Sequence, residues 1–95
     1  MHEQVQIDFK IRYMTKLGQQ LCLVGDLIEL GNWTEFKAKM SWNDGHVWKF
    51  RFVCPSNVSF QYKYVVLNNN LPEKWESGAN RIMDLNDIDN NKVTV

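Results

Sequence analysis

The sequence lacks the features of several protein classes. It holds only two cysteines, Cys22 and Cys54, which excludes a disulfide framework, although a single bridge could form. Eleven Lys and Arg residues balance eleven Asp and Glu residues, so no excess of basic residues supplies the phosphate neutralisation on which nucleic-acid binding depends. No stretch approaches the roughly 20 apolar residues of a membrane span, and the first ten residues lack the apolar segment of a signal peptide. We therefore expect neither nucleic acid nor a membrane as a partner.

Residues that commonly carry catalysis are also sparse. His2 and His46 are the only histidines, and neither has a ligand partner at metal-binding spacing. No glycine-rich phosphate loop or nucleophile-elbow motif is present. Asp84, Asp87 and Asp89 form an acidic segment without the glycine and terminal glutamate of a calcium loop. We expect a non-catalytic chain with no metal or other cofactor. A carboxylate pair facing across a cleft and a calcium-binding loop are the alternatives.

Apolar and polar residues alternate along much of the chain. Strict alternation in residues 5–13 is typical of a half-buried strand, because successive side chains of a strand point to opposite faces. The expected strands are residues 5–13, 21–25, 47–53, 58–66, 81–85 and 92–95. Turn-forming clusters separate them, with a hairpin tip at 68–70, and residues 34–42 are expected to hold at most a single helical turn. Short strands about ten residues apart predict one all-β domain, a sandwich or a barrel.

Four tryptophans are many for a chain of 95 residues. Trp48 alternates in phase with other aromatic residues of its strand and is predicted to lie in the core, whereas Trp33, Trp42 and Trp75 fall in predicted loops. A loop tryptophan can be a lid on the core or part of an exposed aromatic binding patch. Polar residues surround Trp33 and Trp75. A flat ring with polar neighbours is suited to a sugar, whose C–H face stacks while its hydroxyls need hydrogen-bond partners.

Several motifs then resemble those of a known family. "LCLVGDLIELGNW" (21–33), "FQYKYVVL" (60–67) and "KWESGANR" (74–81) follow one another at the intervals of the starch-binding domain of carbohydrate-binding module family 20. The resemblance covers Val5 to Val95. It implies an immunoglobulin-like antiparallel β-sandwich, an open-sided barrel of about seven or eight short strands, which binds α-1,4-glucans such as starch, glycogen, malto-oligosaccharides and cyclodextrins. It also implies a non-catalytic module of a longer protein, which we expect to be monomeric in isolation.

The resemblance implies a first site at Trp33, Lys63 and Trp75, with Glu76 and Asn80 as supporting polar contacts. Alternation places Lys63 on the face opposite the aromatic residues of its strand. We therefore expect its ammonium to be free to donate to sugar oxygens, with a solvated strand lysine as the alternative.

Family members often have a second site. Its backbone loop resembles "TKLGQQL", with Leu17, Gly18 and Gln20 on matching positions. The tyrosine platform of that site is absent, because the loop before Trp48 is short. Trp42 is expected either to replace this platform or to cover the edge of the core.

Asn32 and Asn57 both fit the N-glycosylation pattern. A glycan on Asn32 would stand beside Trp33 and block it, so we expect an intracellular protein that acts on storage glucan. The leading interpretation is a glucan-binding module. The alternatives are a protein-interaction β-sandwich that uses Trp33 and Trp75 as anchors, and a small glycan-processing enzyme.

Overall fold

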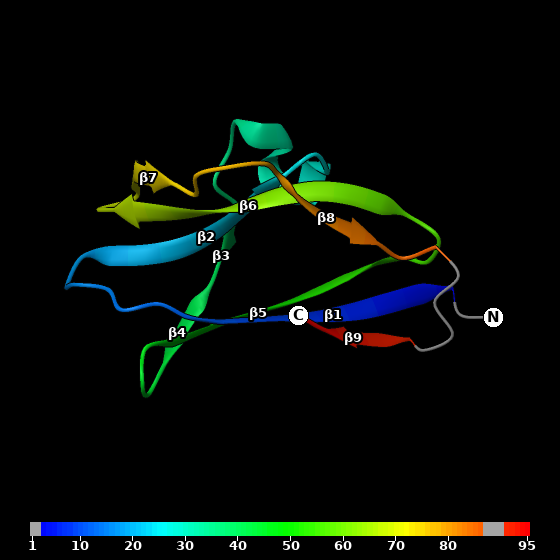
Figure 1. The fold of residues 1–95 in the computed structure, drawn as a ribbon, viewed down its shortest axis with the longest axis horizontal. Coiled ribbons are helices and arrows are strands. Elements are labelled where there is room, and N and C mark those ends of the chain that lie inside the picture. The colour runs from blue at the N-terminus through cyan, green and yellow to red at the C-terminus, as the bar shows by residue number, and fades with distance from the viewer. Residues whose placement is uncertain (1–2, 87–90) are drawn as a thin grey trace.

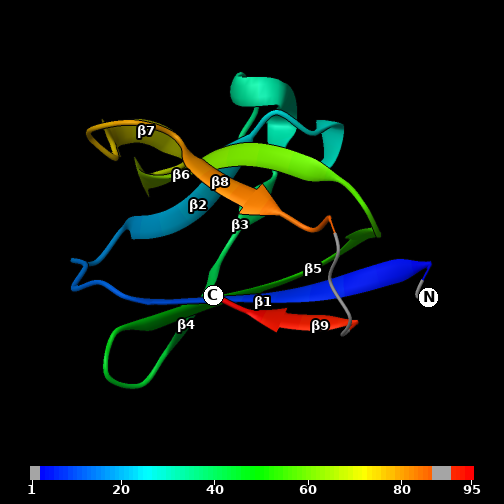
Figure 2. The same cartoon turned by 45° about the vertical axis from the view of Figure 1, so that its right-hand side comes forward.

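Two β-sheets lie face to face in the computed structural model, which describes residues 3–86 and 91–95. Figures 1 and 2 show them as a lower and an upper layer. The four-stranded sheet has the order β4 (Ser41–Asn43), β5 (Val47–Pro55), β1 (Gln4–Arg12), β9 (Lys92–Thr94). The five-stranded sheet has the order β3 (Ala38–Lys39), β2 (Gln19–Gly25), β6 (Ser59–Asn68), β7 (Leu71–Trp75), and β8 (Arg81–Asp84) also pairs with β6. All pairs are antiparallel except β1 with β9, so the predicted β-sandwich is confirmed.

The main core fills the space between the two sheets. Alternate residues of β1 and β6 point into it, among them Ile7, Phe9, Phe60 and Tyr62, all no more than 2% exposed. Trp48 is buried there as predicted, and its indole N–H donates to the carbonyl of Tyr13 at 3.2 Å. Burying each such side chain contributes about 1.5–3 kcal/mol to the free energy of unfolding. The alternation in the sequence therefore fixes which face of each long strand is buried.

The short elements differ from the sequence prediction. Residues 34–42 hold no helical turn. They contain β3 and the first two residues of β4, and a 3₁₀ helix, η1 (Ile28–Trp33), lies just before them. Residues 71–75 form β7 because Asn69 and Asn70, with φ of 51° and 68°, make a tight turn that returns the chain along β6. Trp42 and Trp75 thus lie on short strands and not in loops. The described residues contain nine strands, more than the seven or eight expected.

A smaller apolar cluster lies on the outer face of the five-stranded sheet. It consists of Cys22, Val24, Val65 and Leu67, and Trp33 and Phe36 pack against it. We call it the outer cluster. The segment after β2, including η1, covers this face, so β2 and β6 are buried on both sides at this point (Figure 1). The outer cluster therefore forms an apolar base under Trp33, a residue proposed for the first site.

Both cysteines are buried free thiols, as the sequence prediction favoured. Cys22 belongs to the outer cluster and Cys54 to the main core. Burial raises the pKa of the Cys22 thiol to about 11 and also raises the pKa of Cys54. A high thiol pKa and little access to solvent make both thiols unreactive.

Within the part of the chain that the structure describes, no helix is both long enough and apolar enough to cross a membrane.

Candidate functional site

The site begins at a gap between two short strands on the same edge of β6. Strand β7 pairs with the C-terminal part of β6 and β8 pairs with its N-terminal part. Residues 76–80 connect β7 to β8. The backbone N–H of Glu76 still donates to the carbonyl of Tyr64 at 3.0 Å, and residues 77–80 pair with no strand. Gly78 has a φ of 88°, a conformation that glycine adopts without strain, and no atom lies within 4 Å of the position a Cβ would take. Glycine is therefore required at this position by backbone conformation and not by lack of space.

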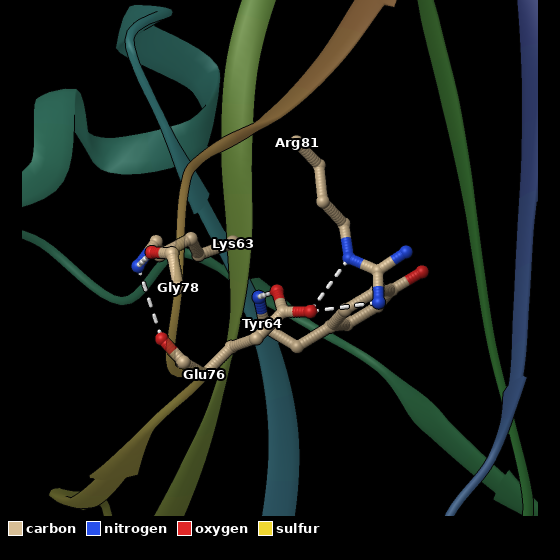
Figure 3. A network of polar contacts seen from close by, with 5 residues as sticks. All are labelled: Lys63, Tyr64, Glu76, Gly78 and Arg81. Carbon is tan, nitrogen blue, oxygen red and sulfur yellow. Dashed lines mark hydrogen bonds and ion pairs between the residues drawn. The ribbon is translucent and has the colours of Figure 1, made fainter.

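Lys63 holds this connecting segment to the sheet. Its ammonium donates to the carbonyl of Glu76 at 3.0 Å and to the carbonyl of Gly78 at 2.5 Å, as Figure 3 shows. An ammonium has three donors, so two of them are used within the protein. The expectation of a free ammonium is therefore wrong, because the connecting segment folds back over Lys63. One N–H remains available for a ligand.

Glu76 is held by hydrogen bonds at both carboxylate oxygens. Oε1 accepts from the backbone N–H of Tyr64 at 3.3 Å, and Oε2 accepts from Nε and Nη2 of Arg81 at 2.8 and 2.7 Å (Figure 3). The hydrogen bond from Arg81 lowers the pKa of Glu76. The guanidinium also lies over the Tyr64 ring, 5.1 Å from its centroid. This arrangement indicates that Glu76 braces the segment after Trp75, with its carboxylate already occupied.

Trp75 and Trp33 lie on the same face of the five-stranded sheet. Trp75 is directly opposite Val65 in the β6–β7 register, and Val65 belongs to the outer cluster against which Trp33 packs. Phe36 links the two regions: it packs on the same cluster and contacts Trp75 edge to face, with ring centroids 6.0 Å apart and planes at 62°. Trp75 remains 41% exposed and Trp33 is half-buried. Both rings therefore combine a packed base with solvent access.

The backbone at Trp33 is unusual. Three successive residues, Gly31, Asn32 and Trp33, have φ of 86°, 49° and 68°. A left-handed conformation is uncommon for a large non-glycine residue and costs of order 1–3 kcal/mol. This strain accompanies the turn that places Trp33 over the outer cluster.

Asn80 is exposed at the end of the connecting segment, and its side-chain amide donates to Gln61 Oε1 at 2.8 Å. The structure thus brings the region of Lys63, Trp75, Glu76 and Asn80 together along β6, with Trp33 on the same sheet face.

Sequence reasoning missed two residues. Phe36 is an isolated aromatic in a polar stretch, and Arg81 lies five residues after Glu76 in the same motif; both were visible signals.

A second group of predicted residues lies at the end of the sandwich near β4. Leu17, Gly18 and Trp42 line a depression of about 310 Å³ together with His46. Trp42 is 49% exposed, and its indole N–H donates to His46 Nδ1 at 3.4 Å. Gln20 does not line this depression, and its side chain instead donates to the carbonyl of Met40 at 3.3 Å. Three of the four predicted residues are therefore brought together.

Of the acidic segment, Asp84 lies among the described residues, and it lines neither group. Asp84 accepts hydrogen bonds from Ser59 and from the backbone N–H of Asn86, which lower its pKa. Asp87 and Asp89, like His2, lie outside the described residues. Among residues 3–86 and 91–95, no cluster of three or more His, Cys, Asp or Glu side chains is arranged to hold a metal ion.

The chain is similar in sequence to segments of known proteins. The family model of the starch-binding domain matches residues 4–95. A glucoamylase of Neurospora crassa is 32% identical over 83 residues, which cover 82% of this chain and 13% of that protein. An alpha-amylase of Streptomyces violaceus is 38% identical over 74 residues, which cover 77% of this chain and 13% of that protein. The chain thus spans about an eighth of the length of either relative.

A solved structure shows the same fold. The family 20 carbohydrate-binding module of a maltotetraose-forming amylase from Pseudomonas saccharophila superimposes with a TM-score of 0.70 at 22% identity. The superposition covers 96% of this chain and 100% of that module. Since the family model spans nearly every residue, the chain belongs to the starch-binding domain family, the glucan-binding, non-catalytic carbohydrate-binding modules of family 20.

Proposed function

We propose that the first site binds α-1,4-glucan chains, including starch, glycogen, malto-oligosaccharides and cyclodextrins, by stacking sugar rings on Trp33 and Trp75. The observation that carries this proposal is the pair of solvent-accessible indoles supported on one sheet face by the outer cluster and by Phe36. Rings anchored in this way lose little conformational freedom when a sugar binds, which favours affinity. We expect single-site dissociation constants in the micromolar range or above, because a short sugar segment buries little area.

The polar residues have two different roles in this proposal. Lys63 and Glu76 fix the segment that follows Trp75, and the remaining ammonium N–H of Lys63 donates to a sugar hydroxyl. Asn80 keeps its amide oxygen and one amide N–H for hydrogen bonds to the ligand, since its hydrogen bond to Gln61 uses one donor. Loop bracing and sugar recognition are thus combined in a small group of side chains.

The test is a titration with β-cyclodextrin followed by tryptophan fluorescence and calorimetry. Trp33→Ala and Trp75→Ala are each expected to weaken binding at least tenfold, with far-UV circular dichroism unchanged. Val53→Ala is the control, because it removes an exposed apolar side chain that lies outside both proposed sites. Normal binding by both first-site variants would contradict the assignment, and no saturable signal from the unmodified protein at millimolar sugar would contradict the function.

We also propose that Leu17, Gly18 and Trp42 form a second glucan site, with Trp42 as its platform. The shared depression and the exposure of Trp42 support this, and we now leave Gln20 out of the direct contacts. Two sites on one polymer raise the overall avidity without stronger single contacts. Trp42→Ala should then lower retention on insoluble starch while cyclodextrin affinity at the first site is kept. Unchanged retention would refute the second site.

For the whole protein, we propose an intracellular role in which this module attaches a further domain to storage glucan. The two free buried thiols and the position of Asn32, next to Trp33, support this. Expression through a secretory pathway should glycosylate Asn32, which is exposed, and abolish cyclodextrin binding. Asn32→Gln should restore binding to the secreted protein. Full binding by a form shown to be glycosylated at Asn32 would contradict the argument.

A further inference from the structure

The outer face of the four-stranded sheet is strongly basic although the chain has no net charge. Strand alternation and register place five cationic side chains on this face among the described residues: Lys10, Arg12, Lys49, Arg51 and Lys92. The one acidic side chain on this face among the described residues is Asp8, which accepts from Arg51 at 2.9 Å and from Gln6 at 3.3 Å, and the bond from Arg51 lowers its pKa. Asp8 is therefore already hydrogen-bonded to Arg51 and Gln6 and does not neutralise the remaining cationic side chains.

Three hydrogen-bond donors lie side by side across this face. Ser41 on β4 is directly opposite Lys49 on β5, and Lys49 is directly opposite Lys10 on β1. Directly opposite residues have Cβ atoms about 5 Å apart, and like charges at such positions are destabilising. Within residues 3–86 and 91–95, the ammonium groups of Lys10 and Lys49 have no hydrogen-bond or ion-pair partner. We call these three residues the donor row.

The surface over the donor row is hollowed. A depression of about 630 Å³ is lined by the donor row and by Asn43, Arg51 and Thr94, among other residues. Every one of these six side chains offers at least one donor, and three carry positive charge. Apart from Lys39 on β3, the depression is lined by residues of the four-stranded sheet, whereas the first glucan site lies on the outer face of the five-stranded sheet. Figure 2 shows these two sheets as opposite layers.

We propose that the donor row binds a phosphate monoester. Such a group carries about 1.5–2 negative charges and three acceptor oxygens, which match two ammonium groups and one hydroxyl. It would relieve the repulsion between the two opposite lysines, neither of which forms an ion pair with an acidic side chain among residues 3–86 and 91–95. A compact dianion fits better than an extended acidic peptide, because the unpaired charges are concentrated at one cross-strand position. The phosphate can be carried by a small molecule or by a sugar unit of a glucan chain.

The first experiment titrates inorganic phosphate and glucose 6-phosphate into ¹⁵N-labelled protein at constant ionic strength, with sodium chloride and glucose as controls. We expect saturable amide shifts centred on Lys10, Ser41 and Lys49, with a dissociation constant of about a millimolar. Lys10→Gln and Lys49→Gln should each weaken binding about tenfold, the loss expected from removing one charge-assisted hydrogen bond. Their melting temperatures should be unchanged or slightly higher, since a like-charge contact is removed.

Lys74→Gln is the matched control, because it removes the same charge from an exposed position on the other sheet. Non-saturating shifts equal to those in chloride, or unchanged phosphate binding by the Lys10→Gln, Lys49→Gln double variant, would overturn the proposal. So would polyglutamate shifting the same amides while phosphate does not, since that result would identify an acidic protein surface as the partner.

A second arm distinguishes the source of the phosphate. If it is carried on the polymer, retention on phosphorylated starch should exceed retention on unphosphorylated starch, and the double variant should lose only this excess. If it is carried on a small molecule, retention on the two starches should be equal while glucose 6-phosphate still binds. Because Trp33 and Trp75 are untouched in these variants, their cyclodextrin affinity should be unchanged, which separates this proposal from the first glucan site.

Discussion

Replacing Lys63 by methionine tests whether its main role is to brace the segment after Trp75. The change keeps an unbranched side chain of similar length and removes the hydrogen bonds to the carbonyls of Glu76 and Gly78. A hydrogen bond to a charged group contributes about 1.5–3 kcal/mol. Because Gly78 is exposed and water can replace part of this interaction, we take roughly 1.5 kcal/mol for the two bonds together. For a domain of this size, that lowers the melting temperature by about 6–12 °C.

The measurement pairs thermal unfolding by circular dichroism with calorimetric titration of β-cyclodextrin. We expect Lys63→Met to lose stability as calculated and to bind sugar more weakly, because the segment beside Trp75 is released and one sugar donor is lost. Lys74→Met is the control: Lys74 is exposed on β7 and has no hydrogen bond to another described side chain, so its melting temperature should change by less than about 2 °C. A Lys63→Met variant with normal melting temperature and lost affinity would refute the bracing role and leave a direct sugar contact alone.

Three further predictions concern the same segment and the outer cluster. The pKa of Glu76 is lower in the folded protein than its ordinary value of 4.5, so its stabilising contribution is complete above that value and is lost as pH falls through the folded pKa. The melting temperature of Glu76→Gln should therefore fall less than that of the unmodified protein between about pH 6 and pH 3. An equal fall in the two proteins would disprove this. Gly78→Ala places a side chain at a φ of 88° and should lower the free energy of unfolding in urea by about 1 kcal/mol without any steric clash; equal stability would show that the segment relaxes freely. Cys22, buried and with its pKa raised to about 11, should react with a disulfide reagent only after unfolding, and rapid reaction of the native protein would contradict the packing of the outer cluster.

The sequence predicted the long strands well because alternation is a local property. Each of β1, β5 and β6 spans about ten residues, long enough for the alternation to appear. Strands β3 and β4 have two and three residues, too few for any period, and their pairing with β2 and β5 depends on contacts distant in sequence. Strand β7 contains no alternation at all, and the tight turn at Asn69 and Asn70 determines its direction. Strands β3, β4 and β7 were therefore missed because they show no alternation, whereas the short strands β8 and β9 were predicted.

The candidate sites were predicted in part for similar reasons. The motifs and their spacing resemble those of the family, and this resemblance indicated Trp33, Lys63 and Trp75, which lie in three separate motifs. The spacing did not indicate that Phe36 contacts Trp75, because that contact joins two segments about forty residues apart. It also did not show that two donors of Lys63 are already used, which depends on the path of residues 76–80.

By itself, the sequence determined which side chains of the long strands point inward, that both tryptophans of the first site have polar neighbours along the chain, and that the chain has no net charge. The tertiary structure alone decided how those residues combine. Strand register brought Lys10, Lys49 and Ser41 into one row from three separate strands, and the packing of η1 brought Trp33 onto the face that carries Trp75. The physical reason is that alternation is fixed within each strand, whereas register and loop packing are set by the burial of the whole core between the sheets.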